Sequence, residues 1–145
     1  MKLQVNLIGQ GHYTGIYTKV KTPASQAGIC YTWGQHHYRT FDGTVYRFSG
    51  ACSYVLAKDQ AEGRFNIMVK NDPACDGSRI GCTRSIVINY GDDQLTLERD
   101  PVTGEASAYG DNMKELFLPE YIYGLTVEKI ADYIIVKVGQ PIELI

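Results

Sequence analysis

Apolar and polar residues alternate along much of the chain after residue 30, which is the pattern of half-buried β-strands. The alternation is clear at 85–90 and again at 94–98. Between these segments, residues 91–93 read Gly-Asp-Asp, and both residue types tolerate the left-handed backbone that short hairpin loops require. We therefore predict a hairpin over 85–98.

A second hairpin is predicted from 125–128 and 133–138, with its turn near residue 131. Residues 45–48, 53–57, 64–69 and 142–145 have the same character. No window of ten or more residues has helical apolar spacing, and the best helical candidate, 113–116, is short. The pattern predicts an all-β fold, an antiparallel β-sandwich or rolled sheet. Because the last predicted strand runs to Ile145, we expect a domain that is truncated at its C-terminus.

The first 29 residues differ from the rest in charge. They carry three lysines and no acid, a net charge of +3, whereas residues 30–145 have a net charge of −5. Small and polar residues at 22–28 resemble a linker. We therefore expect 1–29 to be a tail or the end of a preceding module, with one short strand near 16–20, and 30–145 to be the main domain. The alternative is that 1–29 forms the first hairpin of the same domain.

Length and composition exclude several classes of protein. With 145 residues, the chain suffices for one globular domain, and its formal net charge of −2 provides no basic field for nucleic acid. No apolar run approaches the roughly 20 residues of a membrane span. Polar residues interrupt 3–8, so the N-terminus lacks a secretory signal. The chain is then either cytosolic or part of a longer secreted protein, and the cysteines must decide.

Cys75 and Cys82 flank a polar loop with two glycines. A disulfide closing this loop would contribute about 2.5 kcal/mol on the chain-entropy model and would indicate an oxidising compartment. Paired zinc knuckles are lacking, and the alternative is two buried thiols. Cys30 and Cys52 lie 22 positions apart, and from their spacing they could bond each other, bond residues beyond the chain end, or remain thiols.

Catalytic and metal-binding arrangements find little support. Adjacent His36 and His37 would project to opposite faces of a strand, which argues against a shared zinc ion. No motif supports a thiol hydrolase or a serine nucleophile, so we expect no enzyme. The segment 72–83 begins like a calcium-binding EF-hand loop but lacks its third and twelfth ligands. Asp42, at an Asp-Gly turn, is the remaining candidate for calcium, and a plain turn aspartate is the alternative.

Two longer segments carry a family resemblance. Residues 33–43 (WGQHHYRTFDG) and 46–59 (YRFSGACSYVLAKD) closely resemble the opening of a von Willebrand factor type D domain. The resemblance extends from Cys30 to Ile145 and is nearest to gel-forming mucins, haemolectins and related extracellular glycoproteins.

The resemblance implies roles for particular residues. Cys75 and Cys82 match a local disulfide of that family, and Asp42 matches an aspartate of its structural calcium site. The family partners of Cys30 and Cys52, and the other calcium ligands, lie downstream, so both the pairing and the calcium site are expected to be incomplete here. A family cysteine expected soon after Asp59 is absent.

The implied function is that of a non-catalytic structural module. It would belong to a secreted, extracellular multidomain glycoprotein, stabilised by disulfides and calcium, with neighbouring cysteine-rich modules as its partners. Alternatives are a protein-binding module of a clotting or immune glycoprotein or of a yolk-type lipid carrier and, third, an enzyme, because luciferases can carry this fold.

Overall fold

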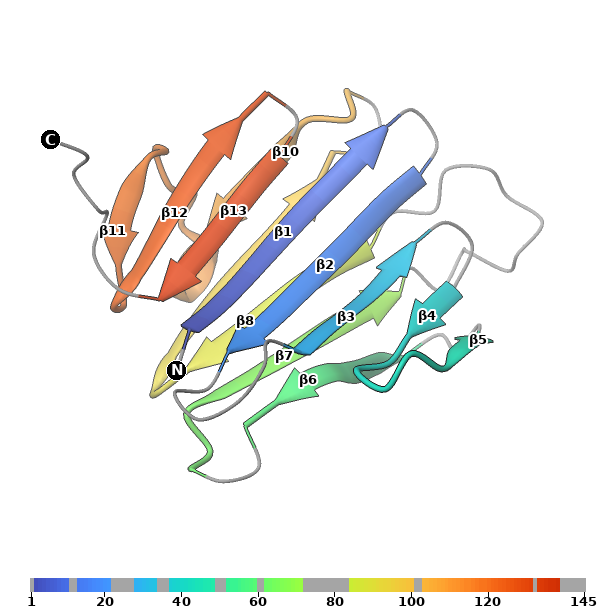
Figure 1. The fold of residues 1–145 in the computed structure, drawn as a ribbon. Coiled ribbons are helices and arrows are strands. Elements are labelled where there is room, and N and C mark those ends of the chain that lie inside the picture. The colour runs from blue at the N-terminus through green and yellow to red at the C-terminus, as the bar shows by residue number, and fades with distance from the viewer. Residues whose placement is uncertain are drawn as a thin grey trace, which may run out of the picture.

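The computed structural model of the chain describes residues 2–10, 13–21, 28–33, 37–48, 52–59, 62–71, 84–100, 103–131 and 133–138. These residues form two antiparallel sheets that face each other (Figure 1). The predicted all-β fold is thus confirmed, with the sandwich as its form.

The larger sheet has eight strands in the order β11-β12-β13-β1-β2-β3-β4-β5. Their bounds are β1 Lys2–Gln10, β2 Tyr13–Lys21, β3 Gly28–Trp33, β4 His37–Arg39, β5 Val45–Arg47, β11 Glu120–Ile122, β12 Leu125–Ile130 and β13 Tyr133–Val138. The smaller sheet has the order β10-β9-β8-β7-β6, with β6 Ser53–Lys58, β7 Phe65–Asn71, β8 Arg84–Tyr90, β9 Asp93–Arg99 and β10 Ala106–Tyr109.

Both predicted hairpins are present. In the first, Tyr90 pairs with Asp93, and Gly91 has a φ of +61°, the left-handed conformation that the turn needs. In the second, Ile130 pairs with Tyr133, and Ala131 occupies the left-handed region with a φ of +52°. Residues 142–145 lie outside the described residues.

The helical candidate at 113–116 does not form a helix. Residues 111–113 make one short 3-10 turn, and Glu115 forms an isolated antiparallel bridge with Tyr109. The backbone N–H of Leu116 donates to the carbonyl of Ala108 at 2.9 Å. Because these backbone groups bond to β10, they are not available for the bonds of a helix.

The N-terminal segment contains two paired strands instead of the one short strand expected near 16–20. β1 pairs with β2 along its length and with β13 on its other side, and β2 pairs with β3. Figure 1 shows β1 and β2 in the middle of the large sheet. This pairing is that of the alternative, a hairpin continuous with the rest of the sheet. The division of the chain at residue 30 into separate modules stays a prediction.

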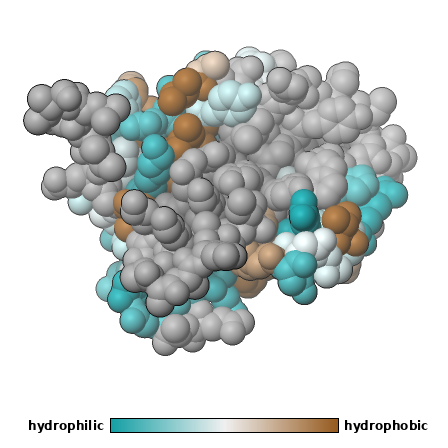
Figure 2. All heavy atoms as spheres, in the orientation of Figure 1, coloured by the Kyte–Doolittle hydropathy of each residue, from teal (hydrophilic) through white to brown (hydrophobic). Residues whose placement is uncertain are grey.

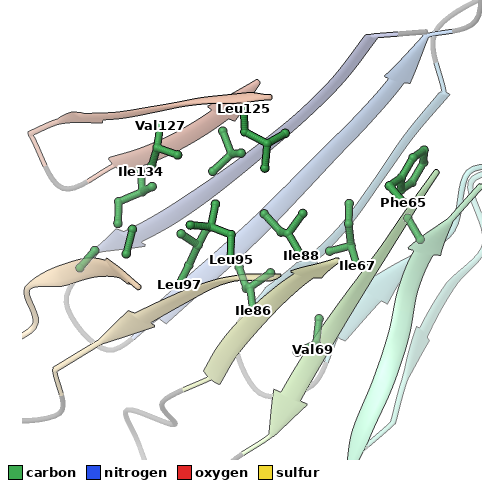
Figure 3. Packing of buried hydrophobic residues seen from close by; sticks show 14 of the residues in the cluster. Phe65, Ile67, Val69, Ile86, Ile88, Leu95, Leu97, Leu125, Val127 and Ile134 are labelled. Atoms are coloured by element: carbon green, nitrogen blue, oxygen red, sulfur yellow. The ribbon is translucent and has the colours of Figure 1, made fainter. Parts of the chain in front are cut away.

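An apolar core fills the space between the sheets (Figure 3). Leu125, Val127 and Ile134 of the large sheet face the small sheet and are at most 1% exposed. The small sheet contributes Phe65, Ile67, Val69, Ile86, Ile88, Leu95 and Leu97. Each fully buried side chain of this size stabilises the fold by about 1.5–3 kcal/mol, so this core is the main source of stability.

Candidate functional site

Asp42 lies in the turn between β4 and β5. The backbone closes the turn through Thr40 N–H to Thr44 O and Gly43 N–H to Thr40 O, both at 3.0 Å. Gly43 has a φ of +87°, a conformation that glycine adopts without strain. The carboxylate Oδ1 of Asp42 accepts hydrogen bonds from the Thr40 hydroxyl and, at 3.4 Å, from the Thr44 N–H. The predicted Asp-Gly turn is therefore present, and the carboxylate helps to hold it.

These hydrogen bonds affect the charge of the Asp42 side chain. The Thr40 hydroxyl, followed by the Thr44 backbone, lowers the pKa of the Asp42 carboxyl below its ordinary value. The side chain is exposed, so it presents an ionised carboxylate to solvent at neutral pH.

Calcium needs about 6–8 oxygen ligands, usually with several carboxylates. Among the residues that the structure describes, no group of three or more His, Cys, Asp or Glu side chains could hold a metal ion. The described residues thus do not by themselves fit a calcium site, and the calcium role of Asp42 stays a prediction.

Cys30 lies on β3, buried between the sheets and 2% exposed. Opposite it, β6 contains a bulge between Val55 and Ala57, and the residue inside the bulge is Leu56. Its carbonyl oxygen lies 3.9 Å from Cys30 Sγ, at the distance of a weak thiol hydrogen bond. Cys30 is therefore part of the contact between β3 and β6.

Cys52 has a different environment. It is an exposed, free cysteine just before β6. Two positions after it, the ring of Tyr54 makes an edge-on contact with Phe48, with the ring centroids 4.9 Å apart. Large apolar side chains are exposed in the same part of the fold: Phe41, Val45, Tyr46, Phe48 and Val55 are 45–58% exposed. We call these five residues the β5 patch.

The β5 patch lies at the end of the sandwich where β5 is the outermost strand of the large sheet and β6 that of the small sheet. On the face drawn in Figure 2, hydrophobic atoms are exposed among hydrophilic ones at the right, where β5 lies in Figure 1. An edge strand with exposed apolar side chains is suited to contact another polypeptide.

Other predicted site residues fall outside the described part of the chain. Cys75 and Cys82 lie there, so their disulfide stays a prediction, as do the statements about His36. The described residues contain no helix long and apolar enough to cross a membrane.

Sequence reasoning missed a buried polar cluster made by Thr32, Tyr38 and Arg84. All three are at most 6% exposed, and Arg84 Nη1 donates to the Thr32 hydroxyl. The signal was present in the alternation of β8, because a period of two places Arg84 on the same face as Ile86 and Ile88. An arginine in phase with core isoleucines predicts a buried cation.

Comparison of the sequence with known proteins identifies a family. A sequence model of the von Willebrand factor type D domain matches residues 30–144. The chain belongs to the von Willebrand factor type D (VWD) domain family. The match begins at Cys30, while the strand pairing of the sheet continues through residues 2–21.

Individual relatives point to the same family. The VWD chain is 42% identical to human otogelin-like protein over 116 residues. This aligned segment covers 76% of the chain and 4% of that protein. It is 30% identical over 119 residues to mouse mucin-19, covering 80% and 2%, respectively. It is 40% identical over 67 residues to silkworm (Bombyx mori) hemocytin, covering 45% and 2%. The chain therefore corresponds to a small part of each relative.

Proposed function

We propose that this VWD chain is a structural, non-catalytic module of a large secreted glycoprotein, and that it acts in assembly through contacts with neighbouring cysteine-rich modules. Its relatives include proteins named as mucins and otogelins, of which it spans 5% or less. A segment of that relative size in a very long chain is expected to act together with adjacent modules.

The observation that carries this proposal is the contrast between the two described cysteines. Cys30 is buried in the core, whereas Cys52 is exposed beside the β5 patch. An apolar surface can bring a partner module into contact, and an accessible thiol near that surface can then form an intermodular disulfide in an oxidising compartment. The described part of the chain thus combines a packed shell with a surface suited to covalent attachment.

Two further parts of the proposal concern the disulfide and calcium. We expect Cys75 and Cys82 to form a local bridge, and Asp42 to contribute one carboxylate to a calcium ion whose other ligands come from elsewhere in the parent protein. The exposed, ionised carboxylate of Asp42 supports the second expectation. Addition of calcium to the 145-residue chain alone should then change its melting temperature little.

The test is disulfide mapping of the full-length protein recovered from culture medium. Non-reducing digestion and mass spectrometry should give one peptide linking Cys75 to Cys82 and another linking Cys52 to a cysteine of a different module. A free Cys52 thiol in the secreted material would contradict the assembly role and leave a protein-binding module as the better description. Retention of the protein inside the cell would contradict the secreted location.

A matched experiment separates Cys52 from Cys30. In the native 145-residue chain, a maleimide reagent should label Cys52 within minutes and label Cys30 only after denaturant is added. The Cys52→Ser variant is the control, because it should remove the fast labelling while leaving the unfolding midpoint unchanged. Equal labelling rates at both positions would remove the basis for assigning attachment to Cys52.

A further inference from the structure

Arg84 is the first residue of β8, and its side chain lies between the two sheets. It is 2% exposed, and it contacts Thr32 of β3 and Tyr38 of β4 in the opposite sheet. Burial lowers the pKa of the Arg84 guanidinium from its ordinary value, but arginine remains charged at any pH at which the protein is folded. A full positive charge is therefore buried in this part of the sandwich.

Part of the guanidinium is satisfied. Nη1 donates to the Thr32 hydroxyl, which in turn donates to the backbone carbonyl of His37 at 2.6 Å. The guanidinium carbon lies 5.4 Å from the centre of the Tyr38 ring, within the range of a cation–π contact. Tyr38 itself is stacked on Tyr46, with their ring centroids 5.2 Å apart. These contacts fix the position of Arg84 but supply no negative charge.

Within the part of the chain that the structure describes, the remaining donors of the cluster have no acceptor. Arg84 Nε, Arg84 Nη2 and the Tyr38 hydroxyl are all buried and lack a hydrogen-bond partner there. Neither the ion pair Arg64–Glu62 nor the ion pair Lys129–Glu105 involves Arg84. Burial raises the pKa of Tyr46, so its hydroxyl stays neutral and cannot serve as the counter-ion. A buried charge without compensation costs several kcal/mol, which makes this arrangement costly unless an anion completes it.

The unsatisfied atoms define the shape of that anion. Nε–H and Nη2–H lie along one edge of the planar guanidinium and point in parallel, which matches the two oxygens of a carboxylate. A single carboxylate also neutralises the single charge of Arg84, whereas a phosphate dianion would bury one negative charge in excess.

We propose that Arg84 and Tyr38 form a binding site for one carboxylate group, held by Nε and Nη2 of Arg84 with the Tyr38 hydroxyl as an additional donor. The carboxylate comes either from a small carboxylic acid in solution or from an acidic side chain of the polypeptide. Both sources have the same recognition chemistry, and the experiment distinguishes them.

The first experiment is an acetate titration of the 145-residue chain at pH 7. Sodium acetate replaces sodium chloride at constant ionic strength, and the melting temperature and the Arg84 Nε–H NMR signal are followed. If the carboxylate comes from solution, both should change with acetate and reach a plateau. Arg84→Met should abolish the change in melting temperature, while Arg64→Met, at an exposed arginine, should leave both changes intact.

Arg84→Lys and Tyr38→Phe keep the test informative if Arg84→Met does not fold. Lysine retains the charge but loses the parallel pair of donors, so half-saturation should need roughly tenfold more acetate. Tyr38→Phe keeps the ring beneath the guanidinium, and it should weaken acetate binding by a smaller factor.

If the carboxylate belongs to the polypeptide, acetate should have no effect on the wild type. The Arg84 Nε–H signal should then be protected from solvent exchange without acetate, and its position should follow the titration of one carboxyl group in the acidic range. An Arg84 signal that responds neither to acetate nor to any carboxyl titration would overturn the proposal, because the donors would then be bonded to water alone.

Discussion

The two ends of the sandwich are built differently. At one end, β12 and β13 share a buried apolar cluster with β8 and β9 through aliphatic side chains such as Leu125, Ile88 and Leu95, all at most 1% exposed. At the other end, the β3–β5 strands face β6 and the start of β8 through Arg84 and its neighbours, and the β5 patch is open to solvent. The first end fills its core with aliphatic side chains, although Tyr121 and Ile130 on its outer strands are exposed, whereas the second, among the described residues, leaves buried donors without an acceptor.

Under the proposed role in assembly, this difference separates the source of stability from the site of function. Burial of aliphatic groups is non-directional and needs no partner, so the apolar end can hold the fold together by itself. Buried polar groups need specific acceptors, and exposed apolar groups gain from contact with another surface. We therefore assign stability mainly to the β12–β13 end, and binding and attachment to the β3–β5 end.

The largest expected effect is at the apolar end. Ile88→Ala removes a side chain that is fully buried, and it should lower the free energy of unfolding by about 3–4 kcal/mol. Val55→Ala in the β5 patch, where the side chain is 50% exposed, should cost less than about 0.5 kcal/mol. Urea unfolding of both variants measures the contrast, and similar losses would break the distinction between the two ends.

A second effect tests how tightly the apolar side is packed near β10. A Cβ on Gly110 would lie 2.7 Å from the Tyr123 hydroxyl, which accepts a hydrogen bond from Asp111 N–H at 2.8 Å. Gly110→Ala should therefore destabilise the protein by about 2 kcal/mol. In a Tyr123→Phe background the same substitution should cost much less, since the clashing oxygen is gone. An unchanged cost in that background would show that the close contact is not the cause.

A third effect tests the polar end. Thr32→Val removes the acceptor of Arg84 Nη1 and should lower the free energy of unfolding by about 1–2 kcal/mol in urea titrations. In an Arg84→Met background, Thr32→Val should lower the free energy of unfolding by less than it does in the wild type. The reason is that the Arg84 donor, which Thr32→Val leaves unsatisfied, is already absent. Strictly additive losses would mean that the two side chains are not coupled.

The smallest effect concerns Asp42. Its folded pKa is lowered, so its contribution to stability is present above the pKa of the unfolded chain and is lost as pH falls through the folded pKa. Thr40→Val removes the main cause of the lowering, and the carboxyl group should then titrate at higher pH in carbon-13 NMR. Thr40→Ser keeps the hydroxyl and should keep the low pKa. Identical titrations in wild type and Thr40→Val would exclude the Thr40 hydroxyl as the cause.

The sequence predicted the strands whose alternation is strong and the turns with glycine. It missed β3, β4, β10 and β11; of these, β4, β10 and β11 are only three or four residues long, and so short a segment shows little periodicity. It also underestimated β1 and β2, where polar residues alternate with apolar ones and the pairing partner β13 is more than 120 positions away.

The candidate site was predicted less completely than the fold. The Asp-Gly turn at Asp42 follows from local chemistry, because Gly43 adopts the left-handed backbone and the Asp42 carboxylate accepts hydrogen bonds within the turn. The environments of Cys30 and Cys52 depend on how β3 and β6 meet, which spacing along the chain cannot reveal. The cluster around Arg84 joins strands from both sheets, and only the phase of one arginine relative to two isoleucines hinted at it.

The position of β1 between β2 and β13 determines the order in which the strands of the large sheet can pair during synthesis. β1 and β2 are made before the other strands of this sheet and can pair at once, yet the other neighbour of β1 is β13, whose last residue is Val138. One whole edge of this hairpin must wait, unpaired, until β13, more than 120 positions further along the chain, has been translated. The large sheet therefore closes only after β13 has been made, and a chaperone that shields this waiting edge would have that interval in which to act.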